Sequence, residues 1–138
     1  MSGLNTLMRR GIVPPLIHGI LDYPLAALLI VAPLLLNFDD AAAKWIAFAL
    51  GIGAAVLAVG TAWRTGIVRI IPPLLHGYTD VVVTVALIVL PFIVGFSGHT
   101  TALVFYVAVG AAGLVATLAT RFEPTMQSEQ SMTMPMAA

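Results

Sequence analysis

Four long apolar runs constrain this chain more than any other feature of its sequence. About 20 apolar residues in a helix cross the roughly 30 Å hydrocarbon core of a bilayer, and runs of that length lie at 14–37, 42–63, 72–96 and 101–121. Only 9% of the residues are charged, whereas a soluble domain carries roughly 25% charged residues. The sequence therefore predicts an all-α, polytopic membrane protein with four transmembrane helices and the lipid bilayer as its partner.

An internal repeat divides the four runs into two copies of a two-helix unit. The segment 14–22 (Pro-Pro-Leu-Ile-His-Gly-Ile-Leu-Asp) returns at 72–80 as Pro-Pro-Leu-Leu-His-Gly-Tyr-Thr-Asp, and 11 of the 25 positions in 14–38 are identical 58 residues later. Extended to the second helices, the same shift aligns Ala58 with Ala116. Because each unit contains an even number of spans, both copies must share one orientation, related by a pseudo-two-fold axis along the membrane normal.

The runs and the repeat together divide the chain into five parts. These are an N-terminal cytoplasmic segment (1–13), the first repeat (14–63), a cytoplasmic loop (64–71), the second repeat (72–121) and a C-terminal part (122–138). The last part is polar, contains proline and lacks periodicity, which predicts a disordered cytoplasmic tail. Its alternating Met132, Met134 and Met136 are of a type that can bind Cu(I), although a disordered terminus accounts for them as well.

Basic residues predict the orientation, because Lys and Arg accumulate in short cytoplasmic loops. All the arginines fall on one side of the predicted topology, namely Arg9, Arg10, Arg64, Arg69 and Arg121. The single lysine, Lys44, falls on the other side. Both termini are therefore predicted to be cytoplasmic, in a multi-pass protein of the bacterial inner membrane. Trp63 and Trp45, near opposite edges, are interpreted as interfacial anchors.

Two His-Asp pairs are the candidate site residues. His18 and Asp22, like His76 and Asp80, are four residues apart, so the two side chains of each pair share one helix face. Helices that open at the preceding prolines place each Asp about 12 Å along the helix axis, just inside hydrocarbon. Because intramembrane carboxylates turn toward the bundle interior or pair, both pairs are predicted to form one inward polar cluster near the cytoplasmic face.

Three roles for this polar cluster remain open from the sequence. The preferred role is structural, with interhelical hydrogen bonds joining the two repeats in a structural or assembly component. The first alternative is a minimal proton or ion conductor or pH sensor, since a His beside a carboxylate can relay protons. The second is haem or metal binding, with His18 and His76 as ligands and the aspartates behind them. Two histidines without a third nitrogen or sulfur donor make a poor zinc site, so no metal and no cofactor is predicted.

Other features of the sequence favour structure over chemistry. Pro33 and Pro91, late in the first and third spans, are candidate hinges, because proline bends a membrane helix and frees a carbonyl. His99 has no partner nearby in sequence and is interpreted as a solvated loop residue. Stripes of small residues allow close helix packing, which leaves a homo-oligomer or another membrane protein as a possible partner.

Two broad classes of function are not expected. The sequence contains no nucleophile-base motif and no phosphate-binding glycine loop, and it has no cysteine. The six Lys and Arg are scattered in a chain of zero net charge, which differs from the basic patch of a nucleic-acid-binding protein. We therefore predict a protein that is not an enzyme and does not bind nucleic acid.

Each copy also carries a proline in a short apolar motif that is followed by a phenylalanine at the outer edge. The two motifs are Ala32-Pro33-Leu34 and Leu90-Pro91-Phe92. The first copy opens with His18, Asp22 and Tyr23, and the second keeps His76 and Asp80 but has Val81 in place of the tyrosine. Over about 14–121 these features resemble the bacterial SPW-repeat membrane proteins, with only the proline of the Ser-Pro-Trp signature retained. The resemblance implies tandem two-helix repeats and no particular mechanism.

Overall fold

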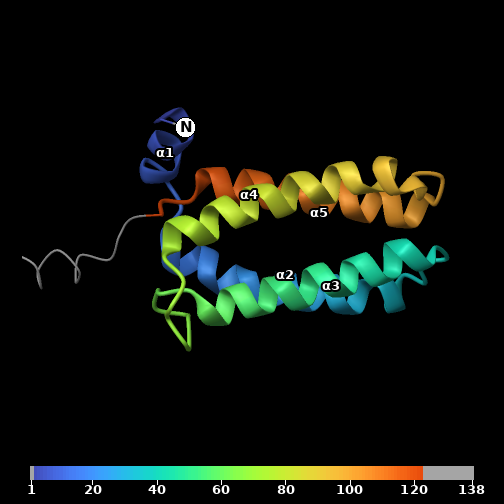
Figure 1. Ribbon diagram of the computed structural model, residues 1–138, viewed down its shortest axis with the longest axis horizontal. Helices are drawn as coiled ribbons and strands as arrows, with labels where there is room; N and C mark the ends of the chain where they lie inside the picture. Colours follow the sequence, from blue (N-terminus) through green and yellow to red (C-terminus); the bar gives the residue numbers. More distant parts are fainter. Residues whose placement is uncertain (1, 123–138) are drawn as a thin grey trace, which may run out of the picture.

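The computed structural model describes residues 2–122, and these residues form four long helices arranged as two antiparallel hairpins (Figure 1). The first hairpin pairs α2 (Pro15–Leu35) with α3 (Ala41–Gly60). The second pairs α4 (Pro73–Leu90), continued by the π-helix η1 (Pro91–Gly95), with α5 (Thr100–Ala119). Each of the four is long and apolar enough to cross a bilayer, with α4 and η1 counted as one. The predicted all-α fold with four membrane-spanning helices is confirmed.

Equivalent residues begin and end the first helix of each repeat. Pro14 and Pro72 precede α2 and α4 in an extended conformation, as expected because proline is tolerated where the helix has no N–H partner to lose. Where these helices end, Asn37 and Gly95 both have positive φ, at 49° and 98°. Asn and Gly are the residue types that adopt this left-handed conformation most readily. The repeat therefore extends to the backbone conformation of the turns.

The second helices of the two repeats are related by 59 residues rather than 58. α3 and α5 begin 59 residues apart, and a glycine marks the closest approach of each to its partner helix. A Cβ on Gly51 would lie 2.7 Å from the Ile30 side chain, and one on Gly110 would lie 2.8 Å from the Ile88 side chain. Glycine is the residue that allows membrane helices to approach this closely. The two glycines are thus equivalent and lie 59 residues apart, whereas the isoleucines that they face, Ile30 and Ile88, lie 58 residues apart.

The extra residue lies in the turn between η1 and α5. Two residues separate Phe38 from the start of α3, whereas three residues separate the equivalent Phe96 from the start of α5. The alignment of Ala58 with Ala116 expected from the sequence is therefore wrong by one position, and Ala58 corresponds to Thr117. The error arose because the shift of 58 residues, which holds for the first helices, was carried over to the second helices, where alanines such as Ala58 also match at that shift.

Side chains join the hairpins at both ends of the bundle. The polar junction consists of the four predicted cluster residues and lies at the end where α2 and α4 begin. The aromatic junction lies at the opposite end and consists of Phe38, Phe96, Phe105 and Tyr106. There Phe38 packs edge-on against Phe105 with ring centroids 5.4 Å apart, and the Tyr106 hydroxyl donates to the Ala43 carbonyl at 2.6 Å.

The end that carries the polar junction is covered by a short helix that we did not predict, α1 (Ser2–Arg9), which packs against α5. Met8 is fully buried there, and its carbonyl accepts a hydrogen bond from the Phe122 N–H at 2.7 Å. Leu4 and Met8, four residues apart, were the sequence signal for this helix. Phe122 is also buried, so the packed region extends one residue into the part assigned to the tail. The remainder of that part, including its methionines, lies outside the described residues.

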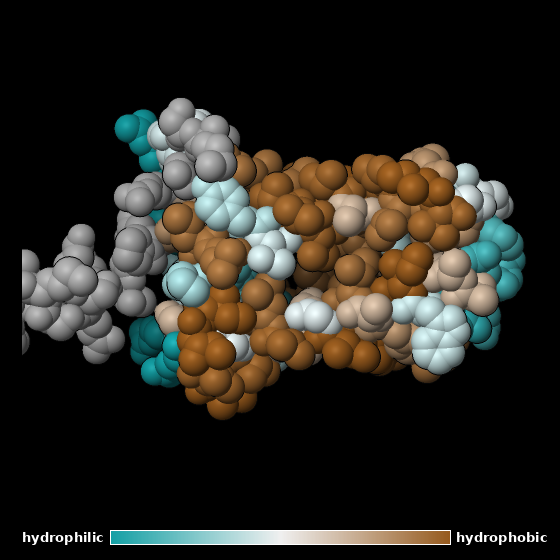
Figure 2. All heavy atoms as spheres, in the orientation of Figure 1, coloured by the Kyte–Doolittle hydropathy of each residue, from teal (hydrophilic) through white to brown (hydrophobic). Residues whose placement is uncertain are grey.

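Apolar side chains cover the middle of the molecule, and hydrophilic residues gather at its two ends (Figure 2). Ile52, Val82 and Val115 are among the large apolar side chains on this surface, at 58%, 68% and 70% exposed. Such a surface suits the hydrocarbon of a bilayer, where exposed apolar residues carry no penalty.

Candidate functional site

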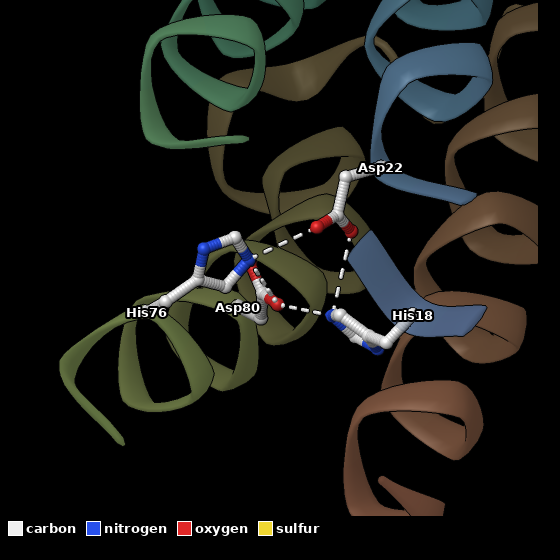
Figure 3. Close-up of side chains that lie close together, drawn as sticks. All are labelled: His18, Asp22, His76 and Asp80. Carbon is white, nitrogen blue, oxygen red and sulfur yellow. Dashed lines mark hydrogen bonds and ion pairs between the residues drawn. The ribbon is translucent and has the colours of Figure 1, made fainter. Parts of the chain in front are cut away.

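The structure brings the four predicted cluster residues together between α2 and α4 (Figure 3). His18 Nε2 lies 2.9 Å from Asp80 Oδ2 of the other repeat and 3.4 Å from Asp22 Oδ1 of its own. His76 Nε2 lies 3.3 Å from Asp22 Oδ2 of the other repeat and 3.1 Å from Asp80 Oδ2. Each imidazole thus faces both carboxylates, which is the arrangement that a pseudo-two-fold axis produces.

All four side chains are largely removed from solvent. His76 is 1% exposed, His18 6% and Asp22 8%, and the Asp80 side chain is 18% exposed. Burying an unpaired charge in an apolar medium costs many kcal/mol. The carboxylates are therefore tolerated here only because the imidazoles or an equivalent positive charge lie beside them.

A threonine hydroxyl holds the far side of each imidazole ring. Thr61 Oγ1 is 2.6 Å from His76 Nδ1 and 2.6 Å from the Leu57 carbonyl oxygen. Thr120 Oγ1 is 2.9 Å from His18 Nδ1 and 2.7 Å from the carbonyl oxygen of residue 116. Each threonine directly follows the second helix of the other repeat, so the hydroxyl contacts repeat the exchange seen for the carboxylates.

These hydroxyl contacts determine which imidazole nitrogen carries hydrogen. A carbonyl oxygen carries none, so at 2.6–2.7 Å it must accept the single hydroxyl hydrogen of the threonine. The threonine oxygen can then only accept a hydrogen bond from the ring, which places hydrogen on Nδ1 of His18 and of His76. In the neutral tautomer, Nε2 of each histidine therefore presents a lone pair to the carboxylates.

The centre of the cluster consequently needs a positive charge. Two neutral histidines with bare Nε2 atoms and two carboxylates carry a net charge of −2, which a buried apolar site does not tolerate. In addition, Asp22 Oδ2 is buried and accepts no hydrogen bond from any described residue, although His76 Nε2 lies 3.3 Å away. Two protons or one divalent cation would supply the missing charge.

Thr61 and Thr120 were not recognised as site residues in the sequence. Their signal was the spacing of 59 residues, which becomes visible only when the second helices are aligned in the correct register. At the shift of 58 residues, Thr61 is set against an alanine at position 119 and the pair is lost. The error in register thus concealed the residues that orient the two histidines.

Aromatic rings cover the cluster on the side of α1. The Trp63 ring lies 4.5 Å from the His76 ring and 5.7 Å from the His18 ring, measured between centroids. Phe122 lies 5.2 Å from the His18 ring. Trp63 is only 5% exposed, so it packs on the histidines rather than lying at the membrane surface as the sequence suggested, while Trp45 is 69% exposed.

A cavity of about 320 Å³ extends from the cluster between the hairpins toward the aromatic junction. Its walls are formed mainly by apolar side chains of α2, α4 and α5, such as Leu25, Val83 and Val109. Beyond the cluster, the described lining includes only Thr84 and Thr117 as polar side chains. The cluster is therefore the polar end of an otherwise apolar space.

The other singled-out residues lie away from the cluster. Pro33 is buried within α2, and Pro91 is buried at the start of η1. The hinge at these two prolines remains a prediction. His99 is not simply solvated, because its Nδ1 lies 2.8 Å from Asp39 Oδ1 of the other repeat. The hydrogen bond from His99 holds the pKa of the exposed Asp39 carboxyl below its ordinary value.

The fold and the cluster define a multi-pass membrane protein built from two tandem two-helix repeats. A family model, the SPW repeat domain, matches residues 16–120 and so includes both hairpins and all four cluster residues. The chain belongs to the SPW repeat family. No curated protein and no solved structure matches it.

Proposed function

We propose that the protein is a structural or assembly component of the membrane, in which the His-Asp cluster acts as a clasp between the two repeats. One observation carries this proposal: each histidine contacts both the aspartate and the threonine of the opposite repeat. Backbone contact between the hairpins is sparse compared with the contact within each hairpin. The clasp therefore supplies much of what holds the polar end of the bundle closed. The protein acts through binding and assembly, without an enzymatic step.

The surroundings of the cluster support a clasp over a minimal proton or ion conductor. A conducted proton needs a succession of polar groups or waters across the hydrocarbon core. The described cavity wall beyond the cluster is almost wholly apolar, and the aromatic junction fills the far end of the bundle. A pH gradient across liposomes is therefore expected to decay at the same rate with the native protein as with a variant carrying His18→Gln and His76→Gln.

The geometry also disfavours a haem between the two histidines. A porphyrin bound through both axial positions must lie between the two Nε2 atoms. Here the carboxylates of Asp22 and Asp80 occupy that space, each within 3.4 Å of an Nε2 atom. A visible absorption spectrum of the purified protein without a Soret band is the expected result.

Distance measurement between spin labels tests the clasp directly, because the chain contains no cysteine that would compete for the label. Ile17 and Leu75 are exposed and equivalent in the two repeats near the polar junction, and Leu36 and Val94 are the equivalent exposed pair at the other end. In one sample, Ile17 and Leu75 are replaced by spin-labelled cysteines. In a second sample, Leu36 and Val94 are replaced in the same way. When Asp22 and Asp80 are both changed to Ala, we expect the first distance to lengthen and broaden.

The second label pair is the matched control for this measurement. The distance at positions 36 and 94 should stay unchanged, because the aromatic junction does not depend on the carboxylates. Circular dichroism checks that the helices persist. An unchanged distance at positions 17 and 75 in a folded Asp22→Ala/Asp80→Ala protein would contradict the clasp.

We further propose that the protein resides in the bacterial inner membrane with both termini in the cytoplasm. The loop between α3 and α4 lies at the same end of the bundle as α1 (Figure 1), and it carries Arg64 and Arg69. Arginine in a short loop favours the cytoplasmic side. Reporter fusions after Arg69 should report cytoplasm and fusions after Asp40 the outside, and the reverse pattern would overturn the orientation.

Assembly with other membrane helices is the remaining part of the proposal. Four helices bury little of their own apolar surface, and much of it stays available for lipid, a second copy or another membrane protein. The protein can be extracted from the membrane in native nanodiscs. The mass of the protein in each nanodisc then distinguishes a single chain from a homo-oligomer.

A further inference from the structure

We propose that the cluster binds one divalent transition-metal ion, and that zinc is the ion its geometry fits. The ligands are His18 Nε2, His76 Nε2 and one carboxylate oxygen each from Asp22 and Asp80. This inference deepens the clasp proposed above and rests on it, because an ion held by both repeats would strengthen the same connection. It revises the expectation of no metal, which placed the aspartates behind the histidines; in the structure the aspartate oxygens face the same centre and complete a set of four ligands.

The distances between the four ligand groups fit a tetrahedral ion. Bonds of about 2.0–2.1 Å from zinc to nitrogen and oxygen imply about 3.3 Å between neighbouring ligand atoms in a tetrahedron. Asp80 Oδ2 lies 2.9 and 3.1 Å from the two Nε2 atoms, and Asp22 faces the same two atoms with a different oxygen each, Oδ1 at 3.4 Å from His18 and Oδ2 at 3.3 Å from His76. One ligand atom from each residue lies within 4.8 Å of all the others, so closing the set around an ion requires only small side-chain rotations.

The threonines orient the histidines as a metal site requires. A metal-binding imidazole must be neutral and must present a bare nitrogen to the ion, while its other nitrogen usually donates to a neighbouring oxygen. Here Thr61 and Thr120 accept from Nδ1, which leaves Nε2 of each ring free to bind. Two independent hydroxyl contacts select the same tautomer, and both nitrogen lone pairs then point at the carboxylates.

Charge and hydrogen bonding in the cluster point to the same ligand. Two carboxylates and two neutral imidazoles are two charges short of neutrality, which is the charge of one divalent ion. Asp22 is only 8% exposed, and its Oδ2 atom accepts no hydrogen bond among the described residues, so it is a buried acceptor aimed at the same centre. Imidazole and carboxylate together suit zinc and its first-row neighbours better than calcium or magnesium, which prefer oxygen ligands alone.

Zinc binding to the full chain in detergent or nanodiscs tests this site. The protein is first treated with a chelator, dialysed and then titrated with zinc chloride, with bound metal counted by elemental analysis. We expect about one zinc per chain and a higher melting temperature of the zinc-loaded protein. Thr61→Val and Thr120→Val should each weaken binding about 10- to 100-fold, as is typical when the group that orients a metal-bound histidine is lost.

The Asp22→Asn/Asp80→Asn protein separates this proposal from the clasp. An amide can still hydrogen-bond to Nε2, so this variant should keep the native label distance at positions 17 and 75 but lose stoichiometric zinc. His99→Gln removes the histidine paired with Asp39 in the outer turn and should leave binding unchanged.

Three results would overturn the metal site: no zinc bound to the native chain, equal zinc binding by the Asn variant, or loss of zinc in His99→Gln alone. None of them alters the label distances on which the clasp depends. The opposite result is also possible to recognise. If the native chain binds zinc but the metal-free Asp22→Ala/Asp80→Ala protein keeps the native label distance at positions 17 and 75, the metal site stands and the clasp is overturned.

Discussion

The two ends of the bundle join the same pair of hairpins by different means. At the polar junction the contributing residues are equivalent in the two repeats, so that His18 and His76 each use an aspartate and a threonine of the other repeat. At the aromatic junction only Phe38 and Phe96 are equivalent. Tyr106, which is fully buried there, corresponds to Ala47 in the first repeat.

The difference follows from what each kind of contact requires. A hydrogen bond or ion pair needs a particular donor and acceptor at about 3 Å, so both repeats must supply matching groups if both histidines are to be satisfied. Apolar packing requires that the space be filled, and one large ring opposite one small residue fills it as well as two medium ones. The polar junction therefore keeps its pseudo-symmetry, whereas the aromatic junction does not need it.

The largest effect is expected from truncating Tyr106, the large side chain that the second repeat contributes to the aromatic junction. Tyr106→Ala should lower the free energy of unfolding by about 4 kcal/mol, because it removes a fully buried ring from between packed aromatic residues. Tyr106→Phe loses only the hydrogen bond to the Ala43 carbonyl and should cost about 1 kcal/mol. Unfolding in mixed micelles of mild detergent and dodecyl sulfate measures both. Equal costs for the two variants would mean that the hydrogen bond, not the packing, joins the hairpins there.

The next effect tests the symmetry of the polar junction. Asp22→Ala and Asp80→Ala should each cost about 3 kcal/mol, because each leaves one member of a buried cluster without its partner. The two costs should agree to within about 0.5 kcal/mol, and the double variant should cost less than their sum because the residues share both histidines. The same unfolding assay applies. One neutral and one severe variant would show that the two sites are not equivalent.

A smaller and equally symmetric effect is expected at the threonines. Thr61→Val and Thr120→Val keep the shape of the side chain but leave the Nδ1 hydrogen of one histidine unpaired, at a cost of about 1 kcal/mol each. Thr79→Val is the matched control, since Thr79 makes the same hydroxyl contact to the carbonyl four residues earlier without facing a histidine. A cost for Thr79→Val as large as the other two would assign the effect to the helix rather than to the imidazoles.

The smallest effect concerns the turns at the end of the aromatic junction, where His99 pairs with the exposed Asp39. Because His99 lowers the pKa of Asp39 in the folded protein, the pair stabilises the fold above the ordinary aspartate pKa of about 3.9, and this contribution is lost as the pH falls through the lowered value. Unfolding of the native and Asp39→Asn proteins should therefore differ slightly at pH 6 and converge in acid, with about 0.15 M salt narrowing the difference. A difference that grows toward acid would have the wrong sign for this pair.

Much of the architecture was determined by sequence alone, because it depends on properties that one helix carries by itself. The length of each apolar run predicted the four spans, and the shared spacing of His18–Asp22 and His76–Asp80 predicted the facing side chains. The cost of charge in hydrocarbon was reason enough to expect these pairs to point inward, and the structure brings them together. The family resemblance likewise followed from local motifs and was confirmed by the match over 16–120.

Only the tertiary structure decided how these helices combine. The extra residue between Phe96 and α5 shifts α5 by one position relative to the repeat, and this register brings Thr120 to His18 and Tyr106 to the first hairpin. Met8 and Phe122 likewise meet over the cluster from opposite ends of the described residues. Apolar and small residues specify that helices pack but carry little information on which registers meet, since neighbouring registers are similarly apolar. The proton positions on the histidines depend on that register, and so the chemistry of the cluster does as well.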